Sequence, residues 1–384
     1  MFAWLSDLGW KTKLSSPGLL AKQAYRKLNG QSNVLRNEKL LGLLERMNGG
    51  LVNKDGSPVE ENKIGGEREL PVAEVKSRLE AASPKGKLHD YLVSKGIFRL
   101  GARVQCPYCL RASWFPLGDV RDTFACPKCQ STFPAIGNLD SCTWCYKTTG
   151  PFSVPNYADG AYSVLLTLDF FNEHRMHTMR TTPVLSFEGE AANGRKLEAD
   201  FAMLWQESIF GERRDGVAFG ECKTYGRFDE KDFERMRYIA KTFPGAVLVF
   251  SALRKSLTAK EISGIVRIAK AGRRHWKADR PINPVLILTG TELLSWRPPP
   301  NCWEDSVRKK FDRMYGLLAV CDATQQIYLN LPSWQVDWRE QWEKKRRRSL
   351  AKRDTGKKRE NNAPGLVEKD LTGKWSGPTS PGES

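Results

Sequence analysis

The 384-residue sequence contains no apolar run close to the ~20 residues that a helix needs to cross a membrane, so we expect no membrane partner. The first residues, MFAWLSDLGWKTKLSS, lack the sustained apolar core and small-residue cleavage site of a secretion signal, which predicts a cytoplasmic protein. The chain also lacks the phosphate-binding loop GxxxxGK[ST]. Any ATPase or helicase that acts with this protein would therefore be a separate partner.

Positive charge is in excess, because 61 Lys and Arg against 44 Asp and Glu give a formal net charge of +17. Such a balance favours a polyanionic partner, with nucleic acid as the first candidate and an anionic membrane surface as the second. Nearly half of the excess lies in residues 339–359, where eleven Lys or Arg and three Asp or Glu leave +8. The folded part of the chain is therefore only moderately basic.

Residues 333–384 are expected to form a Trp-rich helix followed by a basic tail. Trp334, Trp338 and Trp342 recur every four residues, which favours a helix that docks onto the body of the protein. The last ~30 residues hold too little apolar content to fold alone and are predicted to be disordered. The basic run from Lys344 onward fits either sequence-independent phosphate contacts or a solvated end, and the sequence leaves both open.

Residues 1–100 are expected to form a small helical domain, with a polar, glycine-rich linker near residues 48–68. Helical periodicity is present at 17–47 and again at 71–95, where it stops before Gly96. A short apolar stretch follows these helices, as in a winged-helix-like module. A plain helical packing domain fits this pattern at least as well.

Nine cysteines, several in CxxC pairs, indicate metal ligands and reduced thiols rather than a disulfide framework. Two pairs stand sixteen residues apart, in the C-x2-C-x15–20-C-x2-C pattern of zinc sites; they are Cys106, Cys109, Cys126 and Cys129. Each CxxC turn aims two thiolates at one point, and two such turns complete a tetrahedral site. A closed four-thiolate site leaves no position for a substrate, so we expect one structural Zn²⁺ in a zinc ribbon over residues 101–136.

A third cysteine pair, Cys142 and Cys145, has no matching partner pair, and the four histidines are scattered. We interpret these two cysteines as structural thiols. Arg111, Trp114 and Lys128 would allow the ribbon to contact nucleic acid, although solvated charge and packing within the ribbon are the commoner explanations.

The main domain is predicted over residues 155–332 and has the pattern of an α/β core. Asn193-Gly194 stands between two strand-like runs, which is a strong hairpin signal. The order of elements is helix, three strands with a hairpin, helix, strand, helix and strand. The elements that carry this order are a helix at 161–172, strands at 183–187, 196–205 and 217–224, a helix capped by Asp229, a strand at 246–252, a helix capped by Thr258 and a strand at 284–289.

Two acidic residues and a lysine stand out on adjacent predicted strands. Glu221 and Lys223 are two residues apart on one strand and therefore face the same side. Asp200 lies on the preceding strand, where a cross-strand neighbour brings its carboxylate close to Glu221. Phosphodiester hydrolysis uses such a set, because two carboxylates hold one or two Mg²⁺ ions and an ammonium group orients the attacking water. An isolated E-x-K triplet is also frequent on exposed strands and alone carries no function.

With these residues and this element order, residues 160–292 resemble the PD-(D/E)xK, or restriction-endonuclease-like, superfamily. The resemblance implies a mixed sheet flanked by helices, with Asp200 and Glu221 as metal ligands and Lys223 as the catalytic lysine. It further implies that the backbone carbonyl of Cys222 serves as a ligand for one or two Mg²⁺ or Mn²⁺ ions. Glu198-Ala199 precedes the acid where the family pattern has Pro, a variation that is common in the superfamily.

Many members of the superfamily add an acidic residue from the first helix, and Glu173 is the candidate here. Glu188 and Glu190 are rival candidates, but both lie near the predicted hairpin turn. Further candidates for phosphate contact lie downstream of the lysine; they are Tyr225, Arg227 and Arg237.

The resemblance implies a metal-dependent endonuclease that acts on DNA in preference to RNA, in restriction, phage defence or repair. The alternative is a non-catalytic nucleic-acid-binding or scaffold subunit of a larger defence or mobile-element complex. A purely structural role gives no reason to keep a lysine beside two acids, which favours the first hypothesis. The sequence leaves open whether the protein acts as a homodimer or with an ATPase or helicase partner.

Overall fold

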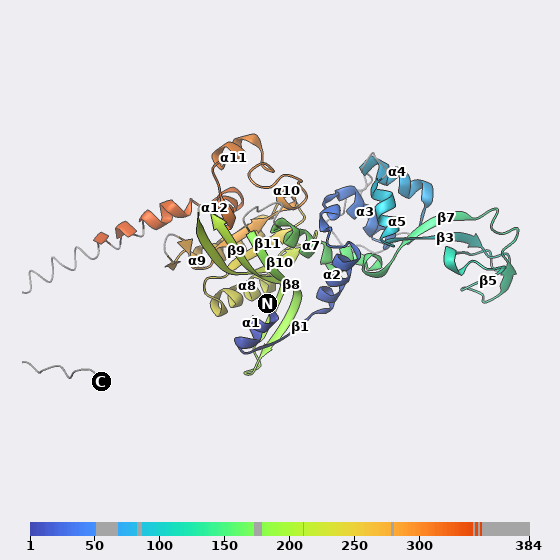
Figure 1. Cartoon of the computed structure of the whole chain (residues 1–384), viewed down its shortest axis with the longest axis horizontal. Coiled ribbons are helices and arrows are strands. Elements are labelled where there is room, and N and C mark those ends of the chain that lie inside the picture. The colour runs from blue at the N-terminus through green and yellow to red at the C-terminus, as the bar shows by residue number, and fades with distance from the viewer. Residues whose placement is uncertain are drawn as a thin grey trace, which may run out of the picture. The chain divides into compact units, whose positions relative to one another are not determined.

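The computed structural model divides into two units, Met1–Trp334 and Gln335–Ser384 (Figure 1). It describes residues 1–50, 68–82, 87–172, 179–209, 211–277, 280–340, 342–344 and 346–347. Glu173, most of the predicted linker near 48–68 and the tail after residue 347 lie outside the described residues.

A six-stranded mixed sheet forms the centre of the first unit, in the order β1-β8-β9-β10-β11-β14. The first four strands pair antiparallel, and β10, β11 and β14 pair parallel. Their bounds are β1 Trp10–Leu14, β8 Met179–Ala191, β9 Lys196–Ile209, β10 Glu212–Lys223, β11 Val247–Ala252 and β14 Val285–Leu288. The protein is therefore a mixed α/β structure.

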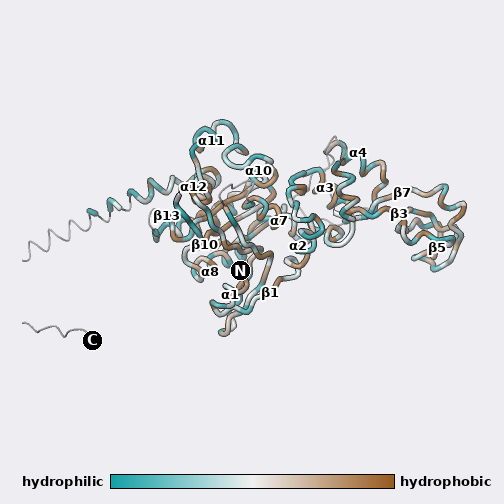
Figure 2. The backbone as a smooth tube through the Cα atoms, in the orientation of Figure 1, coloured by the Kyte–Doolittle hydropathy of each residue, from teal (hydrophilic) through white to brown (hydrophobic). Residues whose placement is uncertain are grey.

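Strand burial follows the sequence pattern. Every residue of β11 and β14 is buried, as their continuous apolar runs predict. Figure 2 shows hydrophobic residues gathered in the middle of this unit, around β10. The predicted Asn193-Gly194 hairpin is confirmed, because Gly194 adopts φ +75° and its N–H donates to the Ala191 carbonyl at 2.9 Å. This turn sets the β8–β9 register, and with it the face on which each β9 side chain lies.

Helices cover both faces of the sheet. On one face, α7 (Ala161–Phe170) packs in a core with Phe201 and Ala218. On the other face, α8 (Glu230–Thr242) and α9 (Ala259–Gly272) enclose a second core that contains Phe219 and Phe250. Both helices begin with the predicted caps, since the Asp229 and Thr258 side chains each complete a capping box. Neighbouring β10 residues thus alternate between the two cores, which places Glu221 and Lys223 on the α8 side.

The amino-terminal segment contributes to two parts of this unit. Residues of β1 form the edge strand of the main sheet, where Trp10 pairs with Ala191 and Leu14 with Phe187. Downstream helices share one hydrophobic core with α7 and the sheet, so they do not have a core of their own. These helices are α2 Ser16–Lys27, η1 Ser32–Arg36, α3 Glu38–Met47, α4 Val72–Ala82 and α5 Lys87–Ser94. The first helix, α1 Phe2–Asp7, precedes β1 and packs through Leu5 in the second core.

Two small sheets are built mainly from strands that follow α5, in and beside the region predicted as a ribbon. One has the strand order β2-β7-β3-β4 and the other is the hairpin β5-β6. Their bounds are β2 Leu70–Pro71, β3 Phe98–Gln105, β4 Ala112–Pro116, β5 Thr123–Ala125, β6 Thr132–Pro134 and β7 Thr143–Thr148, with η2 Leu117–Asp119, η3 Gly150–Ser153 and α6 Pro155–Asp159. The predicted winged-helix-like strand near residue 98 is thus the first strand of a hairpin that leads into the cysteine region.

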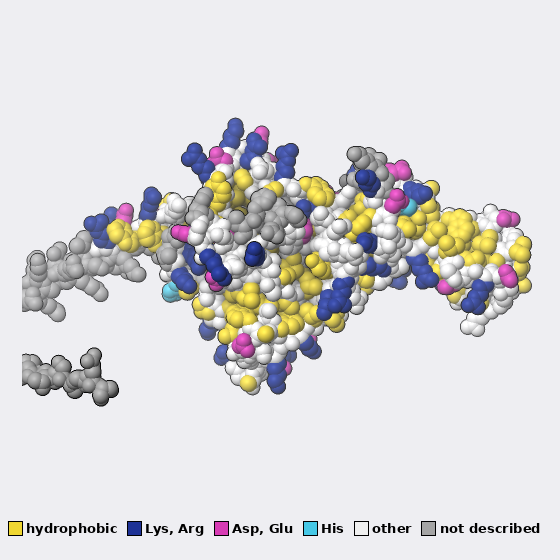
Figure 3. All heavy atoms as spheres, in the orientation of Figure 1, with side chains coloured by type: hydrophobic (Ala, Val, Ile, Leu, Met, Phe, Trp, Pro, Cys, Tyr) yellow, Lys and Arg dark blue, Asp and Glu magenta, His cyan; other side chains and the backbone are white. Residues whose placement is uncertain are grey.

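In the carboxyl-terminal part of the first unit, α12 and α10 pack against β14, the last strand of the main sheet. This part comprises β12 Trp276–Lys277, β13 Arg280–Pro281, α10 Gly290–Leu293, α11 Asp305–Lys310 and α12 Gly316–Leu329. Trp334 is buried at the end of this unit, whereas Trp342 in the second unit is 49% exposed. Among the helices that the structure describes, none is long and apolar enough to cross a membrane. Figure 3 shows Lys and Arg side chains dispersed over the visible face.

Gly220 provides a test of how tightly the sheet packs beside the predicted motif. A Cβ at this position would overlap the Phe201 ring, whereas a Cβ at Gly226 would meet nothing within 4 Å. We expect Gly220→Ala to lower the free energy of unfolding by about 1–3 kcal/mol, because Phe201 has no space into which to move. Urea denaturation of both variants measures this, with Gly226→Ala expected to remain close to wild type. Equal stability of Gly220→Ala and wild type would contradict the packing.

Candidate active site

The candidate site lies where the β9–β10 ladder ends. The last paired residues are Phe201 and Gly220, so Asp200 and Glu221 stand one step beyond the ladder. There the Cys222 backbone N–H donates to Asp200 Oδ2 at 2.6 Å, in place of a strand partner. On its other side β10 stays paired with β11 as far as Lys223. The structure therefore brings together the two carboxylates that the sequence places on neighbouring strands.

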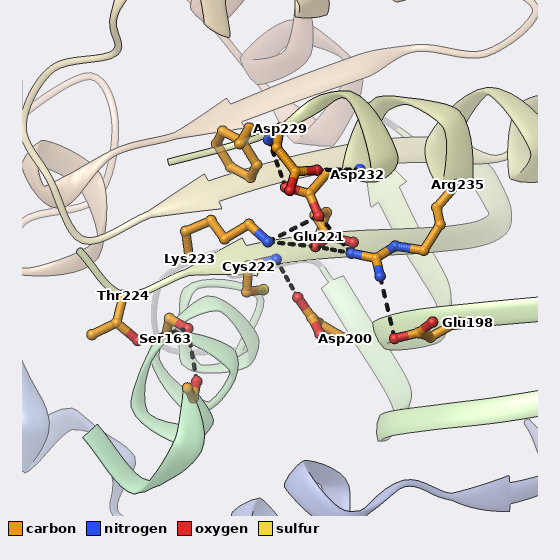
Figure 4. A network of polar contacts seen from close by, with 12 residues as sticks. Ser163, Glu198, Asp200, Glu221, Cys222, Lys223, Thr224, Asp229, Asp232 and Arg235 are labelled. Atoms are coloured by element: carbon orange, nitrogen blue, oxygen red, sulfur yellow. Dashed lines mark hydrogen bonds and ion pairs between the residues drawn. The ribbon is translucent and has the colours of Figure 1, made fainter. Parts of the chain in front are cut away.

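Lys223 lies between two buried carboxylates, as Figure 4 shows. Its Nζ donates to Glu221 Oε1 at 3.1 Å and to Asp232 Oδ1 at 2.9 Å. The Glu221 and Asp232 side chains are each only 3% exposed, whereas Lys223 retains 24% exposure. The ammonium group is thus fixed by two acceptors while part of the side chain remains at the surface.

Two residues of this cluster, Asp232 and Arg235, were not singled out from the sequence. Both come from the first turns of α8, and Asp232 also accepts the Asp229 N–H as part of the capping box. Arg235 donates to Glu221 at 2.7 Å, to Asp232 at 2.6 Å and to Glu198 at 3.3 Å. A signal existed in the sequence, because Asp232 and Arg235 are polar neighbours of Phe233 and Met236 on a helix that directly follows the E-x-K strand. Local pattern does not reveal that this helix turns back over the site.

A buried ion pair positions the loop that leads from Lys223 into α8. Arg254 and Glu261 pair with side chains that are 6% and 1% exposed. Arg254 Nε donates to the Gly226 carbonyl at 3.1 Å, and Glu261 Oε1 accepts the Phe228 N–H at 2.8 Å. Because both ends of the pair hold the loop backbone, the start of α8 and its Asp232 are fixed relative to β10.

Burial sets the protonation of the carboxyl groups. Burial, followed by the charge of Asp200, raises the pKa of Glu221 to about 8, although Lys223 and Arg235 oppose this shift. Burial also raises the pKa of Asp200 to about 6, against the Cys222 N–H and Lys223. Burial by itself would lower the pKa of Lys223. The neighbouring Glu221 and Asp232 carboxylates raise it by a larger amount, so that its net pKa lies above the ordinary value. The site thus holds a charged lysine next to carboxyl groups that would be stabilised by more positive charge.

The donor atoms fit a hard divalent cation. Carboxylate oxygens of Asp200 and Glu221 are the ligands that Mg²⁺ and Mn²⁺ prefer. The Cys222 thiol is no part of this set, because it faces the opposite core, where Sγ lies 3.7 Å from Thr167 Oγ1 and burial raises its pKa well above the usual range. The backbone carbonyl of Cys222 stays a candidate ligand from the resemblance alone.

The remaining predicted site residues lie elsewhere. Glu188 pairs with Lys13 at 3.1 Å on exposed strands, and Glu190 is also exposed. Tyr225 is buried with its ring 5.0 Å from that of Tyr157, which does not fit the phosphate contact expected of it. Arg237 donates to Glu230 at 2.7 Å, and Arg227 is exposed.

The four ribbon cysteines converge on one point. Cys106 Sγ lies 3.7 Å from Cys129 Sγ, Cys109 Sγ lies 3.7 Å from Cys126 Sγ, and all four sulfurs lie within 4.8 Å of one another. Tetrahedral Zn²⁺ with Zn–S bonds of about 2.3 Å places its sulfurs about 3.8 Å apart. The four cysteines can therefore hold one structural metal ion such as zinc.

Each CxxC pair of this site, which we call a knuckle, uses the same backbone turn. Leu110 follows Cys109 with φ +57°, and Gln130 follows Cys129 with φ +62°. In each turn the residue at positive φ donates its N–H to the carbonyl of the first cysteine, at 2.9 Å for Leu110 and 2.8 Å for Gln130. This left-handed residue reverses the chain so that both thiols of a pair point inward.

The other ribbon residues show a mixture of packing and exposure. Cys142 packs against the ribbon core, and Cys145 is buried in β7, where its carbonyl accepts the Trp114 indole N–H at 3.2 Å. Lys147 Nζ covers the Trp114 ring at 4.7 Å, so this tryptophan packs within the ribbon. Arg111 and Lys128 are exposed, and contact between them and nucleic acid stays a prediction.

Removal of one knuckle cysteine tests the metal site. We expect wild-type protein to contain one zinc per chain and Cys126→Ser to lose it, because three thiolates no longer close the tetrahedral site. Cys142→Ser is the matched control and is expected to keep its zinc. Elemental analysis of the purified proteins measures this, and equal zinc content in Cys126→Ser and wild type would contradict the assignment.

The raised pKa of Glu221 predicts a pH dependence of stability. Its pKa is about 8 in the folded protein against 4.5 ordinarily, so the folded state binds more protons between these values. The free energy of unfolding contributed by this group is therefore fully present below pH 4.5 and falls as pH rises toward 8. Glu221→Gln keeps the shape of the side chain without its titration, so its stability should decline less over this range.

Urea denaturation at several pH values without added divalent cations measures this difference. Titration of the cysteines affects both proteins equally and cancels in the comparison. Parallel pH profiles for wild type and Glu221→Gln would show that Glu221 is an ordinary carboxylate.

Comparison with known proteins adds no relative from which a role could be transferred. No model of a protein family, no curated protein and no solved structure matches this chain.

Proposed function

We propose that this protein is a metal-dependent nuclease of the PD-(D/E)xK type that hydrolyses phosphodiester bonds, in DNA rather than RNA. The observation that carries the proposal is the end of the β9–β10 ladder, where Asp200 and Glu221 lie together beside Lys223. The order α7-β8-β9-β10-α8-β11 also agrees with the restriction-endonuclease-like fold that the resemblance implies.

Asp200 and Glu221 would hold one or two Mg²⁺ or Mn²⁺ ions, with the Cys222 carbonyl as a further ligand. The ion supplies charge stabilisation at the phosphate and makes its bound water more acidic. Lys223 is held by Glu221 and Asp232 with part of its side chain at the surface, so it would orient the attacking water or stabilise developing negative charge. Asp232 would keep this ammonium group in place and charged. Glu173, outside the described residues, stays a candidate for a further acid of the site.

Charge supports nucleic acid as the substrate. The whole chain carries +17, which favours contact with phosphate, and its basic run over residues 339–359 belongs to the second unit. The zinc ribbon would add a rigid surface with exposed Arg111 and Lys128. Cytoplasmic restriction, phage defence or repair would suit such an enzyme, alone, as a homodimer or with an ATPase or helicase partner.

One observation favours the second candidate, a non-catalytic nucleic-acid-binding or scaffold subunit. Lys223 and Arg235 both donate to Glu221 Oε1, at 3.1 and 2.7 Å, so this oxygen is saturated by the chain's own cations. A site that stayed closed in this manner would bind no metal. Metal binding and cleavage therefore discriminate between the two functions.

The test is cleavage of supercoiled, linear and single-stranded DNA, and of RNA, with Mg²⁺ or Mn²⁺ and with EDTA. We expect metal-dependent cleavage of DNA that falls about a hundredfold or more in Asp200→Ala and Lys223→Ala, because each removes a group that acts on the reacting phosphate. Glu190→Ala, an exposed acid away from the site, is the matched control and should cleave like wild type.

Folding and zinc content of each variant are checked first, so that lost activity reports the site. Cleavage that survives in both Asp200→Ala and Lys223→Ala would place the activity elsewhere or in a contaminant. Absence of cleavage together with tight, salt-sensitive DNA binding would favour the scaffold function.

A further inference from the structure

Arg235 is the cation of the candidate site that the proposed chemistry does not use. It extends from α8 with 31% of its side chain exposed and donates to Glu221, Asp232 and Glu198 (Figure 4). Lys223 already provides an ammonium group at the same Glu221 oxygen. A second cation at this oxygen therefore needs a reason of its own.

The local charge balance gives that reason. Four carboxyl groups, Asp200, Glu221, Asp232 and Glu198, surround two cations, Lys223 and Arg235. Burial makes ionised carboxylates costly unless positive charge lies beside them. In the protein without a divalent cation, Arg235 provides part of this charge.

We propose that Arg235 is a counter-ion that competes with the divalent cation at Glu221 and, once displaced, binds a phosphate group of the nucleic acid. This role rests on the proposed nuclease function. It makes phosphate binding by Arg235 conditional on metal binding, since the guanidinium group is occupied by carboxylates until the metal replaces it.

Physical reasons support the exchange. A divalent cation at Asp200 and Glu221 would place two positive charges close to the guanidinium group, and like charges a few Å apart repel strongly in a partly buried site. Arg235 lies at the rim, so its long side chain can turn to solvent by rotation about its own bonds. A guanidinium group also matches phosphate geometry in a bidentate manner, whereas a lysine acts as a point charge.

Arg237 on the same helix is a suitable contrast. It pairs with Glu230 at 2.7 Å, and both side chains are 40% or more exposed. No contact joins Arg237 to Glu221 or Asp232 among the interactions of the described residues. Substitution of Arg237 changes the net charge and the helix surface equally, but leaves the carboxylate cluster as it is.

The first measurement is Mn²⁺ binding to zinc-loaded protein without nucleic acid, followed by electron paramagnetic resonance. We expect Arg235→Gln to bind Mn²⁺ on the order of tenfold more tightly than wild type, because a competing positive charge is removed. Loss of Arg235 also strengthens proton binding to Glu221, but a doubly charged ion gains about twice as much as a proton, so the direction is unchanged. Arg237→Gln should bind Mn²⁺ like wild type.

The second measurement is binding of a fluorescent DNA duplex in a Lys223→Ala background, in which cleavage is expected to be about a hundredfold or more slower. With Mn²⁺, adding Arg235→Gln should weaken binding and reduce the salt dependence by about one phosphate contact. Without Mn²⁺, the same substitution should leave DNA affinity unchanged, because the guanidinium group is then held by Glu221 and Asp232. A merely structural role for Arg235 would affect both conditions alike.

The outcomes separate this inference from the proposed function. If wild type binds Mn²⁺ at no site that Asp200→Ala removes, the proposed function fails. If wild type binds Mn²⁺ there but Arg235→Gln binds it equally or more weakly, the counter-ion role is overturned. If the Mn²⁺ result holds but the DNA affinity with Mn²⁺ does not change, the phosphate role is overturned.

Discussion

One hydrogen bond at the end of a ladder organises the candidate site. The Cys222 N–H, which β9 no longer pairs, donates to the Asp200 carboxylate at 2.6 Å. β10 keeps its direction at this point because β11 pairs with it as far as Lys223. Because β10 is still paired with β11 but no longer with β9, its residues Glu221 and Lys223 lie next to Asp200. The change from antiparallel to parallel neighbours across β10 is what makes this arrangement available.

The electrostatic character of the cluster follows from that placement. Side chains that project from the strand toward α8 are buried between sheet and helix, so the Glu221 carboxyl group loses solvation and its pKa rises. Asp232 and Arg235 come from the helix that encloses them, and Arg254 with Glu261 fixes the connecting loop. The same burial that raises the pKa values of the acids strengthens their interaction with a cation, whether that cation belongs to the chain or is a metal ion.

The ribbon, whose four cysteines can hold a structural metal ion, has a different physical basis. Its four thiols converge through two short hairpin turns, and a small apolar core of Phe124, Phe133 and Val104 supports them. So few apolar side chains bury little surface, which is why a bound metal contributes to the stability of such a module. The helices α2–α5, by contrast, share the core of the main sheet and require no metal of their own.

Local sequence pattern by itself determined the features that depend on neighbours in the chain. These include the Asn193-Gly194 hairpin, the caps at Asp229 and Thr258, the buried strand β11 and the spacing of the four ribbon cysteines. Each is set by backbone geometry or by the period of apolar residues within a short segment, so the sequence is sufficient. The proximity of Asp200 to Glu221 was also predictable, because the two residues lie on consecutive predicted strands. Only the tertiary structure decided that Trp10 belongs to an edge strand beside β8, that Tyr225 is buried, and that Asp232 and Arg235 complete the cluster. Those contacts join segments through the packing of helix on sheet, and no local period of the chain encodes which face of α8 meets which residue of β10.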